Sequence, residues 1–168
     1  MTHHNGANQE LLVSWLRDAH AMEKGLVSTL EKHAKDAKRH PELRSRIEQH
    51  VTETRRHAEL VEQCLQQLGE KPSNIKNAMA QVMGTFQGLT TGAFKDEEIK
   101  NGLSDYAVEH FEIGCYRALV EASRLIGQDD IARVCEQILH EEEDMARFLE
   151  QQLPIIVRAV MPDPLPVR

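Results

Sequence analysis

Acidic side chains interrupt the apolar pattern of this sequence at regular places. In the stretch 106–116, Glu109 and Glu112 fall within about 60° of Tyr116 when successive residues are set about 100° apart around a helix, on the face that also carries Ile113. An ionised carboxylate taken out of water costs on the order of several kcal/mol unless it is paired, hydrogen-bonded or bound to a cation. The two glutamates therefore predict a partner inside the protein.

Three further glutamates stand at or beside apolar faces elsewhere in the chain: Glu23, Glu53 and Glu142. Their spacing is regular, because 53 − 23 = 30 and 142 − 112 = 30. An offset of 89 residues places the first half of the chain on the second and also matches Leu30 with Leu119. In two equivalent helical hairpins this spacing brings four carboxylates together, as in a two-metal site bridged by carboxylates.

Two alternatives remain for how such a cluster is neutralised. Two divalent cations would balance four carboxylates, and no Lys or Arg on the same faces offers an equivalent. The other alternative is a carboxylate cluster neutralised by protonation, by water or by neighbouring side chains.

Four long amphipathic segments must position these residues. Apolar residues that recur every three or four positions predict helices over 9–37, 41–68, 96–126 and 130–152. Asn8 and Asp96 are expected to cap the first and third helices, and Gly69 and Gly127 to end the second and third. The weaker pattern between Gly69 and Lys95 predicts a connection that contains one short helix, with Met79, Met83 and Phe86.

Two helical hairpins joined by a long segment predict an all-α, ferritin-like four-helix bundle with a long crossover connection. We expect a disordered N-terminus over 1–8, the bundle over 9–153, and a kinked C-terminal segment and tail over 154–168, because Pro154 should kink or end the last helix. A bundle with an additional helical lid is the alternative architecture.

Composition narrows the classes of partner. The net charge of −7 and the absence of a Lys/Arg cluster argue against nucleic acid, and no apolar run is long enough to cross a membrane. The isolated residues Cys64, Cys115 and Cys135 are typical of reduced core thiols, which predicts a cytoplasmic protein without a zinc site.

Four blocks of the sequence resemble the YciE/YciF-type ferritin-like stress proteins of bacteria, distant relatives of the rubrerythrins: Asp18–Lys24, His50–His57, Glu109–Tyr116 and Leu139–Glu142. The resemblance covers about residues 9–153, and Glu109–Tyr116 carries its most specific part, a Glu-His-aromatic-Glu-Ile…Tyr pattern. It implies a ferritin-like bundle that is dimeric and induced under stress, with no established biochemical activity.

We predict two iron or manganese ions held by six ligands: Glu23, Glu53, His57, Glu109, Glu112 and Glu142. Ferritin-like proteins usually take Glu-x-x-His from two helices, but Arg56 and Met145 stand at those histidine positions, so the roles of His20 and His50 stay open. Tyr116 is the catalytic candidate, either as an electron relay or as a hydrogen-bond donor packed on a carboxylate.

Three functions fit this pattern. One is an oxidase-like or peroxidase-like site that reacts with oxygen or peroxide, another is a non-catalytic stress protein that acts through dimerisation or a partner, and the third is iron storage. A homodimer is expected, since the apolar segment Leu153–Val160 and the apolar residues of the connection exceed what a monomer normally exposes.

Overall fold

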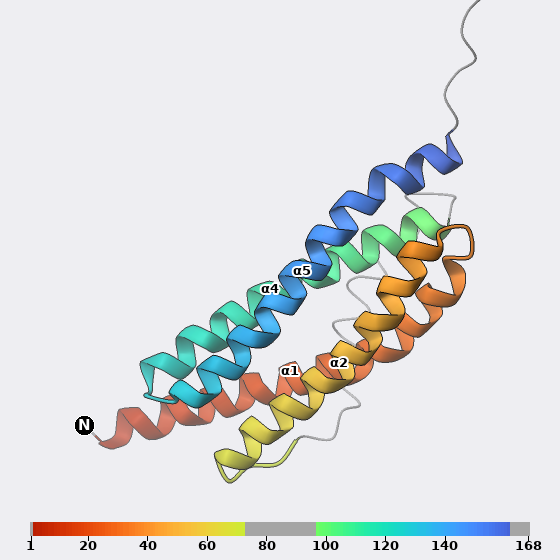
Figure 1. Ribbon diagram of the computed structural model, residues 1–168. Coiled ribbons are helices and arrows are strands. Elements are labelled where there is room, and N and C mark those ends of the chain that lie inside the picture. The colour runs from red at the N-terminus through yellow and green to blue at the C-terminus, as the bar shows by residue number, and fades with distance from the viewer. Residues whose placement is uncertain (1, 73–96, 162–168) are drawn as a thin grey trace, which may run out of the picture.

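The computed structural model describes residues 2–72 and 97–161, with side chains from Gly6 onward. Within these ranges all regular structure is helical (Figure 1): α1 (Thr2–Asp36), α2 (Pro41–Gln67), α4 (Glu97–Leu125) and α5 (Asp129–Val160). The predicted all-α fold is confirmed. The predicted short helix with Met79, Met83 and Phe86 lies outside the described residues.

The helices form two antiparallel hairpins, α1 with α2 and α4 with α5, which meet through α1 with α4 and α2 with α5. Contacts of α1 with α4 pair Glu23 with Tyr116 and His33 with Asp105, so these two helices run in opposite directions. It follows that α2 and α4 point the same way, as Figure 1 shows, so α2 ends and α4 begins at opposite ends of the bundle. This arrangement is the one that the predicted crossover connection requires.

The core is built from aliphatic side chains of all four helices, among them Leu16, Val61, Leu119 and Ile138, each at most 2% exposed. Tyr116 is fully buried with them. In the middle of the bundle this apolar packing gives way to buried acidic residues and histidines. That interruption is the one anticipated from the sequence.

Two helix bounds differ from the expected ones. Helix α1 begins at Thr2 and contains Asn8, because a helix anchored by buried residues is extended at little cost. Helix α5 continues through Pro154 to Val160, where a kink or an end was expected. Ile156 is 1% exposed, so packing holds the helix together beyond the proline.

Gly102 explains how this packing is achieved. A Cβ atom at this position would lie 3.3 Å from Leu153 Cδ2 and 3.5 Å from Ile156 Cδ1, so the missing side chain lets α5 approach α4 closely. Helix α4 is continuous through Gly102. None of the helices described is long and apolar enough to cross a membrane.

Candidate metal centre

Six ionisable side chains from all four helices are buried in the middle of the bundle, each at most 2% exposed: Glu23, His50, His57, Glu109, Glu112 and Glu142. Helix α1 supplies one glutamate, α2 both histidines, α4 two glutamates and α5 one. Five of the six are predicted ligands, and the sixth is His50, whose role the sequence left open.

Five of these side chains form two overlapping groups, and in each group one donor atom per residue lies within 4.8 Å of the others. Glu112 belongs to neither group. In the first, His57 Nδ1 lies 2.8 Å from Glu142 Oε1 and 3.7 Å from Glu23 Oε2. In the second, His50 Nε2 lies 3.1 Å from Glu109 Oε1 and 3.5 Å from Glu142 Oε2. Glu142 therefore belongs to both groups through different oxygens, as a bridging carboxylate would.

Most of the inward atoms of these groups, and one oxygen of Glu112 beside them, are buried without a hydrogen bond. Both oxygens of Glu109 and Glu142, Glu112 Oε1, Glu23 Oε2, His50 Nε2 and His57 Nδ1 are buried without a hydrogen-bonded partner among the described residues. Polar atoms buried in this way cost free energy unless another group satisfies them. Their arrangement around common centres fits metal ions.

The outward nitrogen of each histidine is held by a further carboxylate. His50 Nδ1 lies 3.0 Å from Glu53 Oε2, and His57 Nε2 lies 2.8 Å from Glu141 Oε2. The two rings are 6.5 Å apart between centroids. Histidines that bind metals are commonly oriented in this way, with the second nitrogen on a carboxylate.

Glu53, predicted as a ligand, lies behind His50 and belongs to neither group. It is bound from its outer side by Arg46 Nη1 at 2.9 Å and by Gln49 Nε2 at 2.8 Å. The hydrogen bond from His50, together with Arg46, lowers the pKa of Glu53 to about 2. This carboxylate is placed to orient His50.

Two other residues near the site are Glu141, which contacts it, and His20, which does not. Glu141, the sequence neighbour of Glu142, is 23% exposed and binds both His57 and Arg56. His20 is buried, but it lies outside both groups, with Nε2 3.8 Å from Glu62. Burial lowers the pKa of His20, which favours a neutral ring.

The protonation of the metal-free centre follows from burial and from charge pairing. Burial raises the pKa of Glu109 to about 8 and that of Glu112 well above its usual range. Burial alone would lower the pKa of His57, but the carboxylates of Glu142 and Glu23 raise it to about 10. Protons can therefore neutralise the cluster when no metal is bound.

Tyr116 is held against Glu23. Its hydroxyl donates a hydrogen bond of 2.5 Å to Glu23 Oε1, which leaves Oε2 on the side of His57. Burial, followed by the charge of Glu23, raises the pKa of Tyr116 well above its usual range, so the hydroxyl keeps its proton. The contact fits the predicted hydrogen-bond donor.

Residues 7–161 match the family described as "Domain of unknown function (DUF892)". The chain belongs to the DUF892 family. This family match, together with the shared fold of the solved structures below, confirms the resemblance to YciF-type ferritin-like proteins. This DUF892 protein is 37% identical to a protein of Xanthomonas campestris pv. campestris of known structure, with a TM-score of 0.79 over 92% of this chain and 96% of that one.

Two more distant structures share the fold. The stress protein YciF of E. coli is 20% identical, with a TM-score of 0.74 over 93% of this chain and 98% of that one. A bacterioferritin of Desulfovibrio desulfuricans, described with a diiron site, is also 20% identical, with a TM-score of 0.72 over 92% of this chain and 84% of that one. The DUF892 protein therefore has a ferritin-like fold.

Proposed function

We propose that this DUF892 protein is a stress protein that holds two iron or manganese ions and reacts with oxygen or peroxide. The observation that carries the proposal is the position of Glu142, whose two oxygens take part in two separate buried groups, each with one histidine. Two groups that share a carboxylate are what a centre for two ions requires.

The donor chemistry favours iron or manganese. Each group offers one imidazole nitrogen and carboxylate oxygens, and Glu112 adds a buried oxygen without a hydrogen bond. Oxygen-rich sets of this kind suit iron or manganese better than copper or zinc. The similar bacterioferritin is itself described with a diiron site, which supports iron without deciding the metal.

The protein's own residues would prepare the centre for this chemistry. Two such ions, when bound, supply the two electrons that reduction of one peroxide needs. Glu53 and Glu141 fix the orientation of the histidines, and Tyr116 fixes one oxygen of Glu23. Burial of the six inner side chains limits access of bulk water.

Anaerobic titration with Fe(II), followed by oxygen or hydrogen peroxide, tests the proposal. We expect the wild-type protein to bind about two ions per chain and to develop oxo-ferric absorbance. Glu53→Gln should still bind iron, with an affinity lower by about 10–100-fold, because only the support of His50 is lost. Glu48→Gln, on the exposed side of α2 in an ion pair with Arg44, is the matched control and should behave as the wild type. A wild-type protein that takes up no iron or manganese would contradict the proposal.

One observation favours a second candidate, a non-catalytic stress protein. The buried carboxylates and histidines can neutralise one another through protons, since burial raises the pKa of Glu109 and neighbouring carboxylates raise that of His57. Such a bundle would persist without metal and act through association with a partner. Absence of bound metal in protein purified without chelators would favour this candidate.

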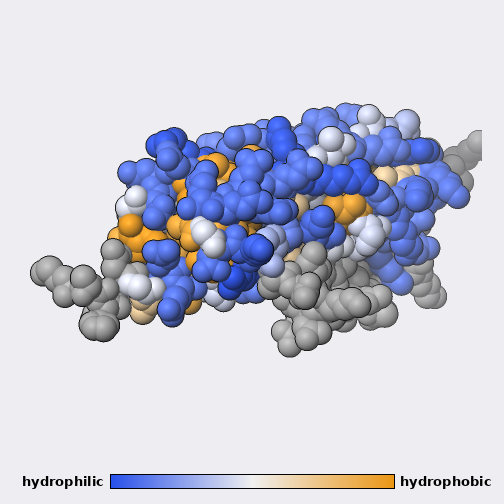
Figure 2. All heavy atoms as spheres, turned by 90° about the horizontal axis from the view of Figure 1, so that it is seen from below, coloured by the Kyte–Doolittle hydropathy of each residue, from blue (hydrophilic) through white to orange (hydrophobic). Residues whose placement is uncertain are grey.

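A cytoplasmic homodimer is part of the proposal. Three apolar residues in the last turns of α5 or directly after it remain accessible in the single chain: Ile155 at 47%, Val157 at 38% and Met161 at 70%. Figure 2 shows further hydrophobic surface where α1 begins and α4 ends, and Trp15 and Leu125 line a groove of about 320 Å³ there. Light scattering at micromolar concentration should give the dimer mass, and a monomer mass throughout would contradict the dimer.

The proposed cytoplasmic location has a separate basis. The free, buried thiols of Cys64 and Cys135 suit a reducing compartment.

A further inference from the structure

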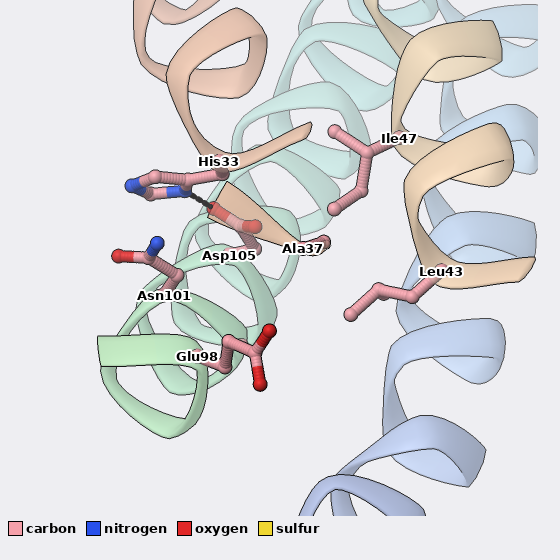
Figure 3. Close-up of a pocket in the computed structure, with 8 residues that line it drawn as sticks. His33, Ala37, Leu43, Ile47, Glu98, Asn101 and Asp105 are labelled. Carbon is pink, nitrogen blue, oxygen red and sulfur yellow. Dashed lines mark hydrogen bonds and ion pairs between the residues drawn. The ribbon is translucent and has the colours of Figure 1, made fainter. Parts of the chain in front are cut away.

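A second buried polar contact joins α1 to α4, away from the candidate metal centre. His33 Nδ1 lies 2.6 Å from Asp105 Oδ1, and the two residues are only 7% and 3% exposed. Figure 3 shows the imidazole reaching from α1 to the carboxylate on α4. Asp105 Oδ2 has no hydrogen bond among the described residues, and the residue lines a cavity of about 10 Å³, room for about one water molecule.

The contact lies close to the turns of α4 that enter the metal centre. Glu109 follows Asp105 by one helical turn and Glu112 by two. Beyond these residues, Tyr116 binds Glu23 of α1. The segment of α4 that carries two candidate ligands is thus held against α1 by a buried polar contact on each side.

A buried histidine–carboxylate contact is a costly way to gain stability, because both polar groups lose their hydration. The contact has a larger effect on how α4 is aligned with α1. A slip of α4 by one residue would separate His33 from Asp105 and leave both groups buried without a partner. The same slip would turn α4 by about 100° and shift it by about 1.5 Å. Glu109 would then no longer face His50.

We propose that His33 and Asp105 are positioning residues, whose contact fixes the register of α4 against α1 and so holds Glu109 and Glu112 in the metal centre. The consequence for metal binding depends on the function proposed above. The register of α4 against α1 does not depend on that function, and it can be measured without metal.

Titration with Co(II) alone tests the consequence for the centre, because visible Co(II) absorption reports the coordination geometry. We expect Asp105→Asn to bind Co(II) about 10-fold more weakly than the wild type, with altered absorption bands. The double variant His33→Asp, Asp105→His, which restores the pair in reverse, should recover both. Asp130→Asn, which removes an exposed ion pair with Arg133 on α5, is the matched control and should match the wild type. Wild-type affinity and spectrum in Asp105→Asn would overturn the proposal, even with a lower Tm.

Hydrogen exchange of the metal-free protein tests the register independently. At one fixed pH, amides of segment 105–116 should exchange about 10-fold faster in Asp105→Asn than in Asp130→Asn. If Asp105→Asn does not fold, His33→Gln replaces it in both measurements, with the same expected result. A wild-type protein that binds neither Co(II) nor iron nor manganese contradicts the proposed function, and unchanged exchange of 105–116 overturns the positioning role.

Discussion

Replacing Glu142 by glutamine is expected to remove both metal ions from the protein, whereas replacement of Glu23 or His50 should weaken one position more than the other. The difference arises because Glu142 Oε1 faces His57 while Oε2 faces His50. A glutamine offers only one oxygen and no charge, so the bridge is lost and at most one ion keeps a weaker, neutral ligand at this residue. We expect the affinity of both positions to fall on the order of 100-fold or more, a loss beyond that typical of outer residues.

Metal analysis after equilibrium dialysis, together with titration calorimetry, measures this effect. Glu143→Gln is the matched control, because the neighbouring carboxylate is 25% exposed and pairs with Arg117 on the outside of the bundle. Its stoichiometry should equal that of the wild type. If Glu142→Gln lost only one ion, or no more than Glu23→Gln, the bridging role of Glu142 would be wrong.

The metal-free protein is expected to lose stability as the pH rises from about 5 to 9. Burial raises the pKa of Glu109 to about 8 from its ordinary value of 4.5, so the folded protein retains a proton that the unfolded chain releases. This contribution is complete below pH 4.5 and is lost towards pH 8. His57 acts in the same direction, because its contribution is complete below 6.5 and is lost as the pH approaches 10. Glu53, with its pKa lowered to about 2, matters only under more acidic conditions.

Together these groups should lower the free energy of unfolding by about 3 kcal/mol over this range, or the Tm by roughly 6–12 °C. Bound metal should reverse the trend, because ions compete with protons for the same atoms and bind more tightly as the pH rises. Thermal unfolding between pH 5 and 9, with EDTA or with Mn(II), checks both statements. Equal slopes under the two conditions would count against metal binding at these residues.

The sequence predicted the fold because the apolar spacing, the glycine stops and the short link 38–40 agree with one another. What it could not predict is the path of α5 beyond Pro154. That path depends on a contact between distant segments, in which Ile156 packs over Gly102. Local propensity at a proline carries no information about such a contact.

Glu53 shows where the site prediction was limited. Equal spacing of 30 residues placed it level with Glu23, but that spacing concerns only the height along the bundle axis and not the direction of the side chain around the helix. Taking the direction of Leu43, Ile47, Val61 and Leu65 as the centre of that face, His50 lies about 40° from it and Glu53 about 100°. This comparison would have favoured His50 over Glu53. No comparable signal marks Glu141, whose contact with His57 depends on how α2 and α5 pack.

Both nitrogen donors of the candidate centre come from α2, and their rings lie 6.5 Å apart. A helix is stiff over the seven residues that separate His50 from His57. The distance between the two rings therefore depends on α2 alone and changes little when the other helices move. The oxygen donors come from α1, α4 and α5, whose distances from α2 are set by packing between helices. The centre should therefore adjust to ions of different radius through small movements of three carboxylate-bearing helices around a nitrogen pair of constant spacing.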